Sequence, residues 1–264
     1  MRKFIAITIC FFASASSTLA LTATDKEFAA AMANGIDLQK HRHYHDALRC
    51  FQQARRLKPD RVDAYDCEGM ALIALDDCRG AADIFTRGIK IDPKFENLYC
   101  SRSQAYFGLG DMKSALADLN HALALKPQVL PYVERRAETY ESLGDHEKAI
   151  EDYTAALALC APVNATRTTP AKPADKERFR LASERGHIYE RLGKYQNAID
   201  DYNLYLSAPE RQRASSVRIL HCRADCYDKL GKHDLAAKDR AAAENHKGDV
   251  LEDLMHDETL GTGR

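Results

Sequence analysis

Small and apolar residues recur at helical spacing along most of the chain, in segments separated by short polar turns. The clearest segments share a block that begins with Leu-Gly and places an alanine six residues later: LGDMKSALADL (109–119), LGDHEKAIEDY (143–153), LGKYQNAIDDY (192–202) and LGKHDLAAKDR (230–240). A Leu-Gly turn followed by an apolar period of three to four residues marks the end of one helix and the start of another. The pattern therefore predicts an all-α chain of paired helices.

The block returns at a fixed period. Its alanine falls at positions that are first 34 residues apart and then 49 and 38 apart: Ala47, Ala81, Ala115, Ala149, Ala198 and Ala236. Twelve residues before this alanine the side chain is always small: Gly35, Gly69, Ser103, Ala137, Gly186 and Ala224. Nine residues before it the side chain is always large: Leu38, Leu72, Tyr106, Tyr140, Tyr189 and Tyr227. Because antiparallel helices pack closely only where small residues meet large ones, each period predicts one helical pair.

This unit of 34 residues resembles the tetratricopeptide repeat, a helix–turn–helix module. Six units begin at Phe28, Val62, Glu96, Leu130, Phe179 and Val217, and positions are counted from these residues. Gly110, Gly144, Gly193 and Gly231 then end the first helix of units three to six. Pro59, Pro93 and Pro127 end the second helix of units one to three. The resemblance implies a right-handed superhelical solenoid whose first helices line a concave groove, chiefly through positions 2, 5, 9 and 12.

Opposite charges follow the repeat in units three to six and are absent from units one and two. Position 7 holds Arg102, Arg136, Arg185 and Arg223. Position 23 holds Asp118, Asp152, Asp201 and Asp239. Their joint occurrence predicts ion pairs between first and second helices, within or between units. The alternative is that repeat duplication copied two independent surface charges, each pair contributing under about 1 kcal/mol.

The two ends and one insertion divide the chain. Arg2 and Lys3, the apolar run FIAITICFFA (4–13) and the small residues before Ala20 are typical of a signal peptide over residues 1–20. We expect the mature protein to be extracytoplasmic, periplasmic or secreted; an uncleaved signal anchor, the alternative, would be its sole membrane contact. Units one to four then occupy residues 24–163, with a capping box at Thr24-Asp25-Lys26-Glu27. A Pro- and Thr-rich insertion occupies residues 164–178, units five and six residues 179–250, and a capping helix and tail residues 251–264.

Composition narrows the function. The 264 residues are 45% hydrophobic with a net charge of −1, which excludes general disorder and argues against a nucleic-acid partner. Seven cysteines remain after residue 20, an odd number for an oxidising compartment, and no CxxC occurs. Cys67 and Cys100 could meet as a disulfide. Cys222 and Cys226 share a helix face, and we interpret them as packing residues rather than metal ligands.

The tract HRHYHD, with His41, His43 and His45, spans the turn of unit one in the repeat register. Alternate spacing across an exposed turn does not direct three ligands to one point, so we expect no metal site there and no cofactor. Motifs for hydrolytic, phosphate-binding or dinucleotide-binding chemistry are missing from the sequence. We therefore expect the protein not to be an enzyme.

The predicted groove is apolar and Met-bearing in units one to three and charged in units four to six. The candidate partner-binding residues are Met32, Ile36, Met70, Ile73, Cys100, Gln104, Phe107, Glu134, Glu138, Glu141, His187 and Arg218. An extended peptide or partner helix could be anchored at the apolar end and selected by charge at the other. Alternatively, the apolar members only pack repeats together. Some family members bind chaperone tails through a clamp of Lys, Asn and Arg at positions 5 and 9 of three successive units. No three successive units here carry that set, so that role is not expected.

The sequence thus predicts a non-catalytic scaffold that binds a protein or peptide in the concave groove. A structural protein that assembles into homo-oligomers is the alternative. A metal carrier or enzyme that uses the Cys and His residues is a third hypothesis.

Overall fold

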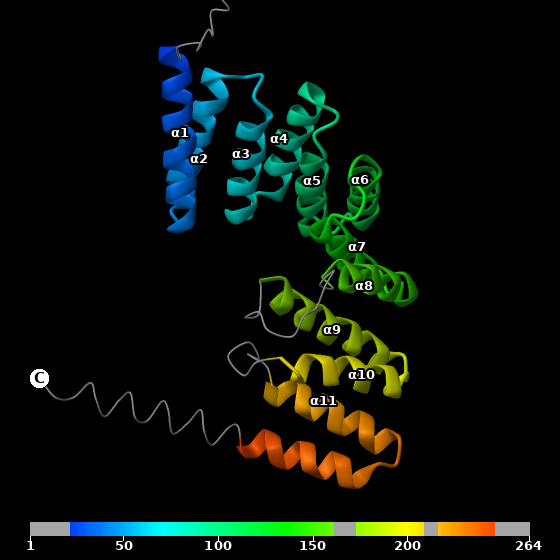
Figure 1. The fold of residues 1–264 in the computed structure, drawn as a ribbon. Helices are drawn as coiled ribbons and strands as arrows, with labels where there is room; N and C mark the ends of the chain where they lie inside the picture. Colours follow the sequence, from blue (N-terminus) through cyan, green and yellow to red (C-terminus); the bar gives the residue numbers. More distant parts are fainter. Residues whose placement is uncertain (1–21, 161–172, 209–215, 246–264) are drawn as a thin grey trace, which may run out of the picture.

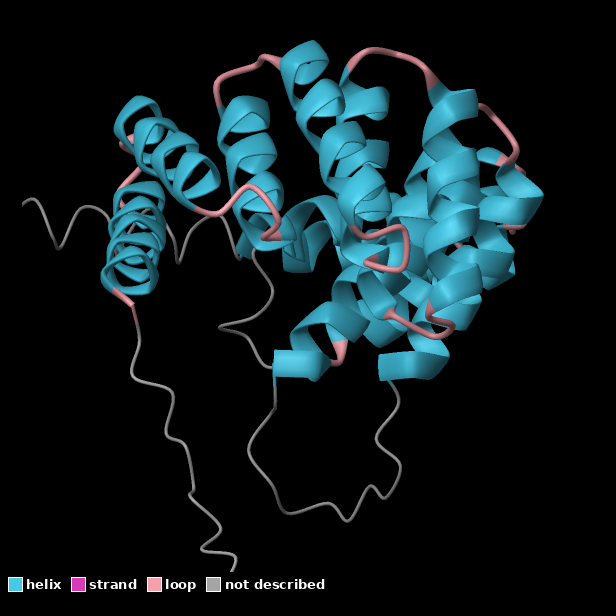
Figure 2. Cartoon of the chain, turned by 90° about the horizontal axis from the view of Figure 1, so that it is seen from above, coloured by secondary structure: helices cyan, strands magenta, loops and turns pink. Residues whose placement is uncertain are grey.

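A computed structural model describes residues 22–160, 173–208 and 216–245, and these ranges contain helices and no strand (Figure 2). The predicted signal peptide, the capping helix over residues 251–264 and most of the insertion lie outside the described residues. The helices are α1 (Ala23–Lys40), α2 (Tyr44–Leu57), α3 (Val62–Ala74), α4 (Cys78–Ile91), α5 (Glu96–Gly108), α6 (Met112–Leu125), α7 (Leu130–Ser142), α8 (His146–Cys160), α9 (Pro173–Arg191), α10 (Tyr195–Leu206), α11 (Ser216–Lys229) and a last helix over residues 233–245.

The helices form successive pairs that stack along one direction, as an all-α solenoid requires. Each odd-numbered helix from α1 to α9 packs against the helix that follows it, and each even-numbered helix packs against the first helix of the next pair. Arg223 of α11 is bonded to Asp239 of the last helix. In Figure 1, α1 to α6 stand side by side, and the pairs from α7 onward are turned relative to them. The predicted all-α tetratricopeptide-like solenoid is confirmed.

Small residues at position 8 let the two helices of a pair approach closely. A Cβ atom added to Gly35 would lie 2.5 Å from the Phe51 ring, and one added to Gly186 would lie 2.8 Å from the Tyr202 ring. The block alanines of all six units are fully buried at the same contact. The small and large residues that recur in the sequence are therefore the residues that pack the two helices of each pair together.

The turn inside each pair requires a left-handed residue at position 15. Gly110 and Gly144 adopt φ values of 75° and 76° there, and the glycines of units five and six behave alike. Arg42 and Asp76 take the same conformation in units one and two, at 63° and 65°. Since a side chain with a Cβ atom resists this region, units one and two hold their turns under local strain.

Two boundaries differ from the sequence prediction. The first helix starts earlier: the Thr22 Oγ1 accepts the Asp25 backbone N–H at 3.1 Å, and the Asp25 carboxylate accepts the Thr22 N–H at 2.9 Å. The capping box is therefore Thr22–Asp25, and Asp25 is fixed further by an ion pair with Lys58 at the end of α2. Helix α9 begins at Pro173, inside the predicted insertion, because proline is compatible with the first turn of a helix.

Candidate partner-binding groove

Arginine and aspartate at positions 7 and 23 form bidentate pairs in units three to six. Arg102 donates from Nε and Nη2 to the two carboxylate oxygens of Asp118, at 2.8 and 2.7 Å. The pairs Arg136–Asp152, Arg185–Asp201 and Arg223–Asp239 have the same geometry, between 2.6 and 2.9 Å. The aspartate side chains are only 5–9% exposed. These pairs join the two helices of each unit rather than lying free on the surface.

The third arginine nitrogen reaches the preceding unit. Each Nη1 donates to a polar side chain at position 25 of the unit before, at 2.6–2.9 Å: Thr86, Asn120, Thr154 and Asn203. Units one and two use the reverse polarity, since Glu68 at position 7 accepts from Arg55 at 2.5 and 3.3 Å. Glu68 is 2% exposed. A polar residue at position 25 was a usable sequence signal for this inter-unit contact.

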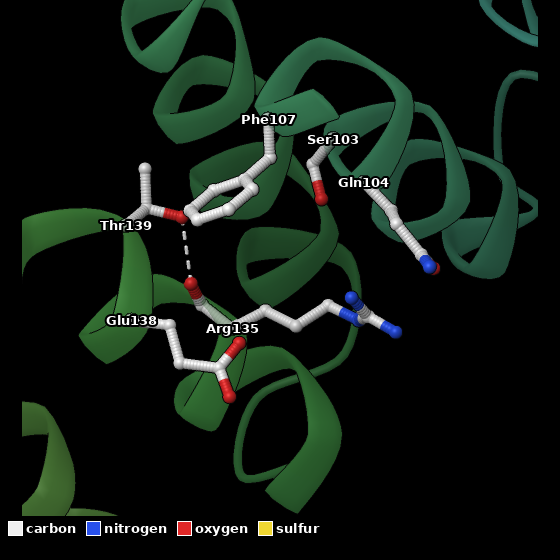
Figure 3. A pocket seen from close by; sticks show the side chains of 6 residues that line it. All are labelled: Ser103, Gln104, Phe107, Arg135, Glu138 and Thr139. Carbon is white, nitrogen blue, oxygen red and sulfur yellow. Dashed lines mark hydrogen bonds between the residues drawn. The ribbon is translucent and has the colours of Figure 1, made fainter. Parts of the chain in front are cut away.

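Helices α3, α5 and α7 carry two adjoining hollows between them. The Phe107 pocket, of about 250 Å³, is lined by Ser103, Gln104, Phe107, Arg135, Glu138 and Thr139 (Figure 3). The Met70 pocket, of about 320 Å³, is lined by Asp66, Met70, Asn97, Cys100, Ser101, Gln104, Val129, Pro131, Tyr132 and Arg135. Gln104 and Arg135 line both pockets, so the two pockets adjoin, and we call them together the α3–α5–α7 groove.

Five of the predicted partner-binding residues meet in this groove: Met70, Cys100, Gln104, Phe107 and Glu138. The other three apolar candidates lie on α1 and at the end of α3. Two of them pack against core residues, and the third is exposed. Met32 packs against core residues of α1 and α2, and Ile73 packs beside the cluster of Ala81 and Phe85. Ile36 is 42% exposed and lines neither pocket.

The remaining candidates carry charged or titratable side chains and lie on α7 and the helices that follow it. They contact side chains of neighbouring helices or are exposed. Glu134 forms an ion pair with Arg180, and Glu141 forms one with Arg191 at 2.7 Å. His187 lies beside Tyr202, and Arg218 is exposed on α11. The structure therefore does not bring these four residues together with the α3–α5–α7 groove.

Arg135 is the charged side chain among the groove residues that the sequence reasoning missed, and Tyr132 is a missed aromatic one. Arg135 occupies position 6, which lies on the same helix face as positions 2 and 9 because residues three or four apart are neighbours. Position 6 of unit four was therefore a usable signal. No carboxylate among the described residues lies within ion-pair distance of its guanidinium, although Glu138 lines the same pocket.

Burial perturbs the titratable groups of the groove. It raises the pKa of Asp66, while hydrogen bonds from Ser101 at 2.7 Å and Asn97 at 2.6 Å lower it. It also raises the pKa of Glu138, and the neighbouring Glu134 adds to that effect. Chiefly through burial, the pKa of the Cys100 thiol rises to about 11. Cys100 is therefore a neutral thiol near pH 7, which suits contact and not nucleophilic attack.

The cysteines and the histidine tract are the other candidate ligands that the sequence offers. All seven cysteines of the described ranges are free thiols, Cys67 and Cys100 included. His41, His43 and His45 are each exposed around the first turn. In the part of the chain that the structure describes, no helix is both long and apolar enough to cross a bilayer.

Comparison with solved structures identifies the same architecture elsewhere. The PilF structure from Pseudomonas aeruginosa matches with a TM-score of 0.66 and 14% identity, over 90% of this chain and 100% of that one. MamA from Desulfovibrio magneticus RS-1 matches with a TM-score of 0.58 and 18% identity, over 74% and 100% of the two chains. A thermophilic TPR protein of Thermus thermophilus matches with a TM-score of 0.54 and 20% identity, over 77% and 98%. At these identities the likeness shows the fold alone.

No curated protein matches the sequence. One family model described as tetratricopeptide repeat matches residues 96–129, 132–161 and 180–211, and a second model of the same description matches residues 32–94. Because these ranges cover more than half of the chain, it belongs to the tetratricopeptide repeat family, whose members generally act as non-catalytic scaffolds for other proteins.

Proposed function

We propose that this protein is a non-catalytic interaction scaffold that binds an extended peptide segment of a partner protein in the α3–α5–α7 groove. We further propose that it acts outside the cytoplasm, in the cell envelope or as a secreted protein, after removal of residues 1–20. The observation that carries the binding proposal is that the Phe107 and Met70 pockets adjoin and share Gln104 and Arg135 in their linings.

The groove offers the two kinds of contact that an extended peptide needs. Met70, Phe107 and Tyr132 supply apolar surface for side chains, and Phe107 is 38% exposed despite its size. The Gln104 side-chain amide has no hydrogen-bond partner among the described residues, so it is available to a peptide backbone (Figure 3). Peptide recognition commonly combines main-chain hydrogen bonds for affinity with pockets for alternate side chains.

Charge gives the groove a means of selection. Arg135 presents a cation with no ion-pair partner in the described ranges, whereas Asp66 and Glu138 present carboxyl groups whose charge is disfavoured by burial. A peptide that places an acidic side chain near Arg135 and apolar side chains in the pockets satisfies this arrangement. We therefore expect a partner segment of mixed acidic and apolar character.

The test is a peptide-library selection on the purified protein, followed by fluorescence anisotropy with the enriched peptides. Phe107→Asp should weaken binding by more than about tenfold, which corresponds to about 1.4 kcal/mol. Leu125→Asp is the matched control, since Leu125 is 39% exposed and lies outside both pockets. Equal affinity of both variants would refute the groove proposal. The competing outcome is homo-oligomer formation. Analytical ultracentrifugation of the free protein would detect it as an apparent mass that rises with protein concentration.

The location is tested separately. Mass spectrometry of the protein recovered from its native host should give a chain that begins after Ala20, in the extracytoplasmic fraction. An intact N-terminus in the cytoplasm would refute this part of the proposal and leave the groove proposal standing.

A further inference from the structure

A second group of chemically active side chains converges between units five and six, away from the α3–α5–α7 groove. His187 and Glu190 lie one turn apart on α9, and Cys222 faces them from α11. Their ligand atoms all lie within 4.8 Å of one another. Within the described ranges no other three His, Cys, Asp or Glu residues converge in this way.

Tyr202 holds the histidine and the carboxylate in place from a third helix, α10. Its hydroxyl is 2.9 Å from His187 Nδ1 and donates to Glu190 Oε2 at 2.6 Å. Tyr202 is fully buried, and its ring meets the imidazole edge-on at 5.4 Å between centroids. Because hydrogen bonds to ligand side chains fix their orientation, this phenol prearranges two donors before any ion arrives.

One atom of the group is left unsatisfied by the protein. His187 Nε2 is buried and has no hydrogen-bond partner among the described residues. An unpaired buried polar nitrogen is destabilising, because it has lost its hydrogen bonds to water without replacement. An external group that engages the imidazole would remove the deficit.

The surrounding charge favours a cation. Glu190 carries a negative charge within the group, and Glu184 and Asp225 add negative charge from the flanking helix positions. Arg218 is the positive group that acts on His187 and Cys222, and Cys226 lies one turn beyond Cys222 as an uncharged thiol. Three carboxylates against one guanidinium leave the neighbourhood net negative.

We propose that His187, Glu190 and Cys222 form a binding site for a divalent ion of the Zn²⁺ type, which ties α9 to α11. Imidazole nitrogen, thiolate sulfur and carboxylate oxygen are the donors that Zn²⁺ takes. In a tetrahedral zinc site such donors are about 3.3–3.8 Å apart, so the present group must contract by roughly an ångström. On binding, the Cys222 proton passes to solvent, and a water molecule completes the four ligands. The site goes beyond the proposed peptide groove and does not depend on it.

The competing interpretation is a buried tyrosine network beside a packing cysteine, and Co²⁺ spectroscopy on the full, metal-free chain separates the two. Binding through Cys222 should give one Co²⁺ per chain with a sulfur-to-cobalt charge-transfer band and the intense visible bands of a four-coordinate ion. Zn²⁺ should then bleach these bands. Ions held only by the exposed tract of His41, His43 and His45 would give no sulfur band, which would overturn the proposal.

Variants assign the ligands. Cys222→Ser should abolish the charge-transfer band, and Cys226→Ser, the matched control one turn away, should retain it. His187→Gln should weaken binding by more than about tenfold, since even outer partners of metal ligands cost about 10–100-fold when removed. Circular dichroism checks that each variant is as helical as the wild type. Absence of the band from the wild type, or its survival in Cys222→Ser, would overturn the proposal.

Discussion

Removal of one position-7 arginine tests whether its ion pair with the position-23 aspartate of the same unit stabilises the array. In Arg102→Leu, the Asp118 carboxylate loses both of its guanidinium hydrogen bonds while it remains only 8% exposed. Breaking a buried pair at one partner costs about 3–5 kcal/mol, because the remaining charge is left uncompensated. Arg102 itself is 16% exposed, so solvent screening removes little of this cost. We expect a loss of about 3–5 kcal/mol in the free energy of unfolding.

The double variant Arg102→Leu/Asp118→Leu separates the pair from the packing. Replacing both charges with apolar groups is often neutral or stabilising, so most of the lost stability should return. Thr86, which loses the Arg102 donor, keeps its own hydrogen bond to the Ala82 carbonyl at 2.7 Å and does not become unsatisfied. The comparison therefore reports the ion pair rather than a third, orphaned group.

Urea unfolding followed by circular dichroism measures both variants by linear extrapolation. Arg240→Leu is the control, because Arg240 also pairs with two aspartates but is exposed on the last helix, and no change is expected. A loss below about 1 kcal/mol for Arg102→Leu would place the pair among surface ion pairs and refute the reasoning.

The turns, the helix contacts and the groove give further predictions. Asp76→Gly should stabilise the protein by about 1 kcal/mol and Gly144→Ala should destabilise it by a similar amount, both by thermal unfolding, because both positions have positive φ. Gly35→Ala should cost about 1–3 kcal/mol by urea unfolding, since its Cβ would meet Phe51 at 2.5 Å; an unchanged midpoint would mean that the ring moves freely. Burial raises the pKa of Glu138 above its ordinary value of 4.5. The protonated Glu138 therefore contributes fully to the stability of the fold below pH 4.5, and this contribution is lost as the pH rises through the folded-state pKa. Glu138→Gln should therefore gain stability over the wild type above that range, and identical pH profiles would contradict the inference.

The repeat made much of the fold predictable from one sequence. Because the unit occurs six times, the same position can be compared across six copies. This comparison predicted the small residue at position 8 and the burial of the block alanines. Comparison of the units also predicted the ion pair between Arg102 and Asp118, because arginine at position 7 and aspartate at position 23 are present in the same four units and absent from the other two. What a period cannot give is the start of the first helix, where Thr22 and Asp25 form a capping box that the starts of α3, α5 and α7 do not have.

The candidate sites were less predictable because they depend on how neighbouring units meet. The period assigns Gln104, Phe107 and, through position 6, Arg135 to one helix face each, but it does not show that α5 and α7 pack so that the three line one pocket. Likewise His187 and Cys222 are 35 residues apart, on helices α9 and α11, with α10 between them in the sequence. The sequence assigns each to a helix face, but side-chain conformations and the rotation between units decide that they meet.

The reversed polarity of the first inter-unit contact restricts the order in which units can be joined. Thr and Asn alternate at position 25 and serve the following arginine equally well, so units three to six present compatible joints to one another. The joint between units one and two instead places Arg55 against Glu68. Fusing unit three directly to unit one would leave Arg55 without Glu68 and would bring Arg102, which is paired with Asp118, to the same part-buried contact. An array that gains or loses a later unit keeps the same kind of joint, whereas separating unit one from unit two removes the Glu68 partner of Arg55.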